Sequence, residues 1–456
     1  MTLPSQLPTH SVEAESSNSL PESPEQKLEI SYQQMIFWSA IVGLIGGLVA
    51  TAYYYLLEAS NHLVWHTLPE VLAPLLPASF STWQYLLFAT TTGGLLVGLT
   101  LHWMGAPGEM ARVVNDVHDP GRIDIRQTPS MIVASLFSIT AGGSAGPEAP
   151  LVQVNASFGS WLGMRLKLSS DAIRKLTFCG MSAALGAFFG APLGGALFAL
   201  EIPHRRGLEY YEALIPAVIS ATLSFVVFRS TTGLTIGGMY YFPEAPKLAL
   251  VNMAEGALLG LAGALVAVFF VLVFRGIGYF THRIEHHRIP LATFGGLAIG
   301  LIALAFPQTL FFGEQQIQTI IDTGSTWGIS LLLLTAFAKI LAICFTLHCG
   351  FRGGFIFPLF FVGAAVGLAI SLAVPQIHPT IGMLCMMAAV NVAVTKTPLS
   401  TTVILTVISD TSMVPVILTA SFVSFLLTMP VSLIRTQRAR SSSEEFSFPK
   451  QLVESA

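Results

Sequence analysis

Residues 146–153 read Gly-Pro-Glu-Ala-Pro-Leu-Val-Gln within a long apolar stretch of the chain. The acid, Glu148, lies in sequence suited to a membrane interior, where an ionisable side chain is costly and is therefore expected to be functional. Pro147 favours a helix start, because proline is well tolerated in the first helical turn. The backbone N–H groups that follow such a start attract anions. The pattern predicts an anion pathway with a carboxylate gate.

The composition is that of a polytopic membrane protein. The 456 residues are 53% hydrophobic and only 10% charged, whereas soluble domains carry about 25% charged residues. Several apolar segments are shorter than the roughly 20 residues that cross a bilayer. Gly and Pro interrupt them, which indicates half-helices that meet near the middle of the membrane. We therefore predict an all-α fold with broken and short helices.

The chain divides into an apolar body and two polar tails. Residues 1–30 are rich in Ser, Pro and Glu and predict a disordered tail rather than a signal peptide. Residues 436–456 form a second short polar tail. The body, 31–435, contains two halves at about 80–230 and 290–435. Basic residues gather in several loops, and an even number of membrane crossings separates each of these loops from the next. All of them can therefore lie on the cytoplasmic side, where basic residues are enriched. We predict a multi-pass protein of the plasma (inner) membrane with both tails in the cytoplasm.

The two halves of the body repeat a sequence pattern. Cys179 and Cys385 each precede a Pro-Leu pair by thirteen residues. Upstream of each Cys, a Gly is followed by a Pro-Leu pair and a second Gly at the same spacing. The first set is Gly146, Pro150-Leu151 and Gly159, and the second is Gly354, Pro358-Leu359 and Gly367. Both matches fall at helix breaks, which argues for a duplicated half. The distribution of basic loops places the halves in opposite senses, so the repeat is predicted to be inverted.

These motifs together resemble the CLC family of chloride channels and proton-coupled anion antiporters. Besides residues 146–153, the likeness rests on Gly-Met-Ser-Ala-Ala at 180–184 and Gly-Gly-Phe-Ile-Phe-Pro at 353–358, and it covers roughly residues 35–435. The resemblance implies a homodimer in the lipid bilayer with one pathway in each subunit. It implies small inorganic anions as partners, with bound chloride or a similar anion. No nucleic acid, organic cofactor, metal or enzyme activity is expected.

The resemblance assigns the gate to Glu148, since the family carries its external gate in a Gly-(Lys/Arg)-Glu-Gly-Pro motif. This chain departs from that motif at Pro147, which replaces a basic residue, and at Ala149, which replaces glycine. The first change makes the site less positive, and the second stiffens the backbone. An alternative role for Glu148 is simply to stabilise a helix N-terminus.

Four further residues are candidates for anion binding by the same resemblance. Pro107 falls where the family carries a serine whose hydroxyl donates to the anion; proline cannot donate, and family members with proline here favour nitrate. Phe355 and Ile356 lie at a helix start whose amides can face an anion. Ser432 lies where the family has a tyrosine hydroxyl. Turn, packing and capping roles are the alternatives for these residues.

The chain also departs from the antiporter members, which often carry two adjacent acids at the position of Glu201 and Ile202. The second acid is the internal proton acceptor, and isoleucine cannot carry a proton. The sequence therefore favours passive conduction of chloride or another small anion through a glutamate-gated pathway. The alternative is a proton-coupled chloride or nitrate antiporter, with Glu201 as a possible proton relay. A structural role for Glu201, paired with a nearby basic loop, is also open.

Two other classes of protein have weaker support. An intramembrane enzyme would need a nucleophile and base, two facing acids or metal ligands in the apolar segments, and Glu148 has no partner spaced for catalysis. A transporter of organic anions would need a cationic clamp inside the membrane. Arg352 and Lys396 are the candidates for such a clamp.

Overall fold

The computed structural model describes residues 28–75, 82–108, 110–205, 207–234, 237–431, 433–434 and 436–439. The predicted tails, 1–30 and 436–456, lie almost entirely outside these ranges. Within them the protein is all-helical and contains no β-strand, as predicted. The α-helices are α1 (Tyr32–His62), α2 (Leu68–Leu72), α3 (Thr82–Trp103), α4 (Met110–His118), α5 (Thr128–Thr140), α6 (Glu148–Arg165), α7 (Ser170–Phe189), α8 (Pro192–Glu201), α9 (Leu214–Thr232), α10 (Leu250–Thr281), α11 (Arg288–Ala305), α12 (Glu314–His348), α13 (Ile356–Ala373), α14 (Pro379–Thr395), α15 (Pro398–Ser409) and α16 (Val414–Thr428).

Long and short helices are mixed, which is the predicted pattern of broken membrane segments. Seven helical segments in the described ranges are long and apolar enough to cross a membrane, among them α1, α10 and α12. Others are too short, such as α8 with 10 residues and α15 with 12. The long helix α12 is itself interrupted at Gly328, where φ is 77°. Short helices therefore begin and end inside the protein, where their terminal amides and carbonyls need partners.

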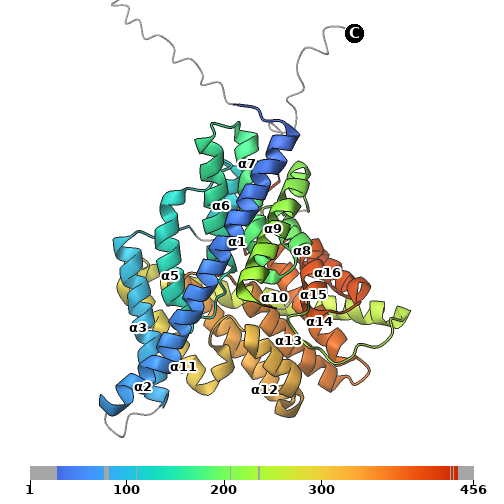
Figure 1. The fold of residues 1–456 in the computed structure, drawn as a ribbon. Helices are drawn as coiled ribbons and strands as arrows, with labels where there is room; N and C mark the ends of the chain where they lie inside the picture. Colours follow the sequence, from blue (N-terminus) through green and yellow to red (C-terminus); the bar gives the residue numbers. More distant parts are fainter. Residues whose placement is uncertain are drawn as a thin grey trace, which may run out of the picture.

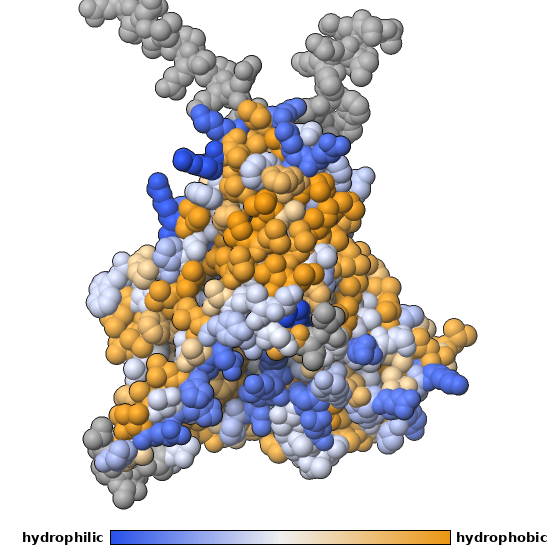
Figure 2. Space-filling view, in the orientation of Figure 1, coloured by the Kyte–Doolittle hydropathy of each residue, from blue (hydrophilic) through white to orange (hydrophobic). Residues whose placement is uncertain are grey.

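Large apolar side chains cover much of the surface. Leu258, Leu265 and Leu272 on α10 are each more than 60% exposed. Figure 2 shows a broad apolar area on one face, with hydrophilic residues at the end where the two described chain ends lie and again toward the opposite end. An exposed apolar area of this extent is the surface of a membrane protein. The chain is therefore a multi-pass integral membrane protein.

The centre of the molecule is formed by α13, α14 and the first turns of α6, whose residues are buried almost throughout. The helix α1 runs along most of the length of the outside, and both described chain ends lie at the same end of the molecule (Figure 1). Serine and threonine hydroxyls tie neighbouring helices together; Ser220 Oγ of α9, for example, donates to the carbonyl of Cys179 on α7 over 2.9 Å.

Candidate functional site

The starts of α6 and α13 meet through their backbones in the buried centre of the protein. The N–H of Gly146 donates to the carbonyl of Gly354 over 2.7 Å, and the N–H of Gly354 returns the bond over 2.7 Å. The helix α6 begins two residues after Gly146, and α13 begins two residues after Gly354. Two helix N-termini are thus fixed beside one another. Each carries amides without intrahelical partners and a partial positive charge.

Glu148 spans the gap between these two helices. Its side chain is only 1% exposed, and its Oε1 accepts a hydrogen bond from the N–H of Ile356 over 3.0 Å. The other carboxylate oxygen, Oε2, is buried and accepts no hydrogen bond from any described residue. A buried oxygen without a donor costs free energy. The carboxylate is therefore held at the start of α13, but it is held incompletely.

Two glycines make room for the carboxylate. A Cβ atom on Gly354 would lie 2.3 Å from Glu148 Cδ, and one on Gly146 would lie 2.0 Å from Glu148 Oε2. Neither separation is compatible with van der Waals contact, so any larger residue would displace the carboxylate or the backbone. The paired glycines, which the sequence pattern placed in equivalent motifs, thus form the walls of the carboxylate site.

One of the predicted anion-binding positions, Phe355, lines a cavity of about 1160 Å³. Phe355 lines it together with Ala149 of α6. Pro107 is buried in the loop after α3, and its neighbours Ala106 and Gly108 line the same cavity. Ile356 is buried beside Phe355, and its amide is the one that Glu148 engages. Phe355 therefore lines the cavity itself, whereas Pro107 and Ile356 are adjacent in the chain to residues that line it.

Ser432 lies outside the described residues. Leu433 and Ile434, which follow it, line the cavity.

Basic side chains surround the wider part of this cavity. Arg352 lies near the start of α13, while the others come from the end of α10 and the turn that follows it. In the part of the chain that the structure describes, the lining arginines are Arg275, Arg283, Arg288 and Arg352, and Glu285 is the only lining acid. A cavity with one sign of charge raises the local concentration of ions of the opposite sign. The space leading to Phe355 therefore favours anions.

Glu201 lies away from this site and has different partners from those expected. Its carboxylate accepts hydrogen bonds from the N–H of Leu399 over 3.2 Å, from the N–H of Ser400 over 2.8 Å and from Ser400 Oγ over 2.5 Å. It therefore caps the N-terminus of α15, and among the described basic residues none forms a salt bridge with it. The expected pairing with a basic loop stays a prediction, because Arg206 of that loop lies outside the described residues, while the start of α15 supplies the hydrogen bonds that the described residues give to the acid.

Two buried lysines have structural roles. Lys396 Nζ donates to the carbonyls of Ala393 and Thr428 over 2.5 and 2.6 Å, so it joins the ends of α14 and α16 rather than forming a clamp for a substrate. Sequence reasoning missed Lys339, whose fully buried Nζ donates to the carbonyls of Thr309 and Phe311 over 3.1 and 2.7 Å. The signal for Lys339 was a single lysine in the apolar run of α12.

Comparisons with known proteins agree with this geometry. The family model for the voltage gated chloride channel matches residues 93–429. A chloride/fluoride channel protein of Pseudomonas syringae pv. tomato is 25% identical over 427 residues, which cover 91% of this chain and 89% of that protein.

Two solved structures have the same fold. The crystal structure of a CLC-type fluoride/proton antiporter has a TM-score of 0.76 at 20% identity and covers 90% of this chain and 100% of its own. The crystal structure of a slow cyanobacterial Cl⁻/H⁺ antiporter also has a TM-score of 0.76 at 20% identity. The match covers 87% of this chain and 96% of the antiporter chain. At this level of identity the likeness concerns the fold. Because the family model spans most of the chain, and the fold and the paired helix starts agree with it, the protein belongs to the voltage-gated chloride channel (CLC) family.

Proposed function

We propose that this protein exchanges small inorganic anions for protons across the membrane, with Glu148 as the gate. The hydrogen bond from Ile356 N–H to Glu148 Oε1 is the observation that carries the proposal. A helix-start amide is a natural anion ligand, and here a carboxylate occupies it. A transported anion must displace that carboxylate, and protonation of Glu148 weakens its hold by removing its charge. Anion binding and proton binding at Glu148 are thereby linked.

The two solved structures favour exchange over the passive conduction that Ile202 suggested. One is a fluoride/proton antiporter and the other is a Cl⁻/H⁺ antiporter. Passive conduction remains the second candidate, because Ile202 cannot carry a proton and the Pseudomonas relative is named a channel. The two candidates differ in one measurable quantity, which is uphill proton movement.

Chloride is the anion we propose first, because the family model and the Pseudomonas relative both name it. Nitrate and fluoride are its competitors, and nitrate gains support from Pro107, which supplies no hydroxyl donor for a strongly hydrated ion such as chloride. We also propose, on the family resemblance, a homodimer in the plasma membrane with both termini in the cytoplasm and a separate pathway in each subunit.

The test uses purified full-length protein in liposomes with a chloride gradient and a pH probe in the lumen. We expect protons to move against their own gradient while chloride moves down its gradient. Chloride flux without any proton movement would establish passive conduction instead. Repeating the measurement with nitrate and fluoride ranks the anions.

A further inference from the structure

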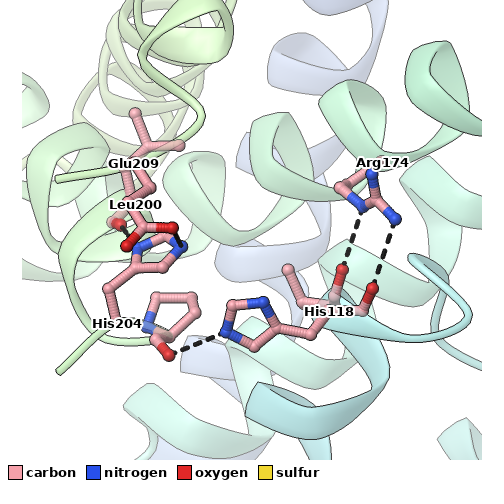
Figure 3. A network of polar contacts seen from close by, with 7 residues as sticks. His118, Arg174, Leu200, His204 and Glu209 are labelled. Atoms are coloured by element: carbon pink, nitrogen blue, oxygen red, sulfur yellow. Dashed lines mark hydrogen bonds and ion pairs between the residues drawn. The ribbon is translucent and has the colours of Figure 1, made fainter. Parts of the chain in front are cut away.

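The C-terminal end of α8 is capped by side chains from distant parts of the chain. A helix end leaves carbonyls without intrahelical donors. Here His204 Nδ1 donates to the carbonyl of Leu200 over 2.6 Å, and Gln437 Nε2 donates to that of Ile202 over 2.9 Å. His118 Nε2, from the end of α4, donates to the carbonyl of Pro203 over 2.9 Å (Figure 3). Two buried imidazoles therefore lie at the end of the helix that carries Glu201.

The hydrogen bonds of His204 define which of its nitrogens titrates. A carbonyl oxygen can only accept, so Nδ1 carries the proton that points at Leu200, and the other nitrogen, Nε2, gains or loses a proton. Nε2 lies 3.9 Å from Oε2 of Glu209, and the two side chains face each other in Figure 3. The His204 side chain is fully buried, whereas that of Glu209 is 28% exposed. Glu209 thus connects a buried imidazole to the aqueous side.

Glu201 lies within one turn of His204, and its site suits both of its protonation states. The N–H of His204 donates to the carbonyl of Glu201 over 2.9 Å, so the two residues are fixed in one tight turn. Ser400 Oγ donates to the ionised carboxylate at 2.5 Å. A hydroxyl can also accept, so the same serine satisfies a protonated Glu201 by reversing the bond. The amides of Leu399 and Ser400 then bind the remaining lone pairs.

The groups that face His204 come from several elements of the fold, and the charged ones among them affect how stable its imidazolium form is. Glu209 and Tyr210 belong to its own loop, and the centroid of the Tyr210 ring is 5.4 Å from that of His204. The His118 ring lies 5.1 Å away. The cations in this surrounding are Arg174 of α7, which stacks over Tyr210 at 5.2 Å, and Arg438, whose charge acts on His118. Glu209 is the acid that faces Nε2, and it stabilises the imidazolium form of His204.

We propose that Glu209 and His204 form the route by which protons from the side bearing the chain ends reach Glu201 on their way to Glu148. The inference rests on the proposed function, because a passive channel needs no such route. In the first step, a proton from solvent, gathered at Glu209, binds His204 Nε2 and converts imidazole to imidazolium. In the second step, Nε2 releases that proton through water to the Glu201 carboxylate. His204 returns to its neutral form, and Glu201 becomes the carboxylic acid.

His118 provides the contrast. Its Nε2 donates to Pro203, and Arg174 donates to the carbonyls of Val117 and His118 over 3.2 Å each. Burial is the largest cause that lowers the pKa of His118, which lies on the short helix α4 outside the apolar spans; the charges of Arg438 and Arg174 act in the same direction, while the hydrogen bond to Pro203 and the charge of Glu209 oppose the shift. A lowered pKa disfavours the imidazolium form, and we assign His118 a positioning role.

The test compares His204→Asn with His118→Gln in the liposome assay. The amide of asparagine can keep the bond to the Leu200 carbonyl but cannot titrate, and glutamine can likewise keep the bond to Pro203. We expect His204→Asn to lower proton flux about tenfold or more, the scale of a lost proton-transfer group, while anion flux stays within about twofold because the cap is kept. His118→Gln should keep the wild-type ratio of protons to anions.

Glu209→Gln supplies a second route to the answer if His204→Asn fails to fold. Glutamine keeps the shape of this partly exposed side chain but removes its acid. We therefore expect proton flux to fall, as in His204→Asn. A wild-type proton-to-anion ratio in folded His204→Asn, or in Glu209→Gln where the first variant does not fold, would overturn the route while leaving exchange intact. Absence of proton movement in the wild type would overturn exchange and the route together.

Discussion

The carboxylate of Glu148 on α6 accepts a hydrogen bond from the amide of Ile356 on α13, although 208 residues separate the two in the chain. The negative side chain of one helix thus fills the anion-attracting end of another. The bond is made by one oxygen only, and Oε2 has no donor among the described residues. A gate that must leave its site during each cycle should be held in this way, firmly enough to close and loosely enough to open.

Replacing Glu148 by glutamine should remove both the pH dependence and the proton coupling of transport. Ionised Glu148 competes with the anion, and its protonation at lower pH relieves this competition, so wild-type anion flux should rise as pH falls. Glutamine is neutral at every pH and cannot carry the proton. The measurement is anion flux in liposomes from pH 4 to 8 with a proton probe. Identical profiles for Glu148→Gln and the wild type would make Glu148 a structural residue.

Gly354→Ala should open the gate without changing any ionisable group. The added Cβ would lie 2.3 Å from Cδ of Glu148 and should push the carboxylate off the Ile356 amide. We expect higher anion flux at pH 7.5 and a weaker dependence on pH. Gly276→Ala is the matched control, because a Cβ there meets no atom within 4 Å. Equal flux in both variants would mean that the wall around the carboxylate is not what holds the gate closed.

Pro107→Ser should shift selectivity from nitrate towards chloride. The substitution adds a hydroxyl donor between Ala106 and Gly108, which both line the cavity. Chloride is smaller and more strongly hydrated than nitrate, so it should gain more from one well-aimed donor. The check is the ratio of nitrate to chloride flux in paired liposome assays. A ratio that the substitution leaves unchanged would place Pro107 outside the anion path.

Lys339→Met should destabilise the protein while leaving the proton-to-anion ratio unchanged. It removes the donor to the carbonyls of Thr309 and Phe311, and a buried carbonyl without a donor costs about 1–3 kcal/mol. The melting temperature in detergent should therefore fall by several degrees. The control, Lys175→Met, breaks an i,i+4 pair with Asp171 at a partly exposed position, where such pairs contribute about 0.3–0.5 kcal/mol. Equal melting temperatures for the two variants would contradict the structural role of Lys339.

The features that depend on local pattern could be predicted from the sequence alone. Composition determines the membrane class, since 53% hydrophobic and 10% charged residues cannot make an ordinary soluble domain. Pro147 before Glu148 predicts a helix start with an acid in its first turn, and α6 begins at Glu148. The amide of Ile356 at a helix start was predicted in the same way. Each inference needs only a few neighbouring residues, because helix starts are set by local backbone preferences.

Only the tertiary structure decided which of these local features touch. No periodicity relates Glu148 to Ile356, Glu201 to Ser400, or Lys339 to Thr309, because each pair is joined by the path of the chain between them. The basic loop expected to pair with Glu201 is close to it in the sequence, whereas the amides that donate to its carboxylate belong to the start of α15, about 200 residues away. Buried polar groups must be satisfied by whatever donor the packed helices bring within reach, and that donor is a property of the fold.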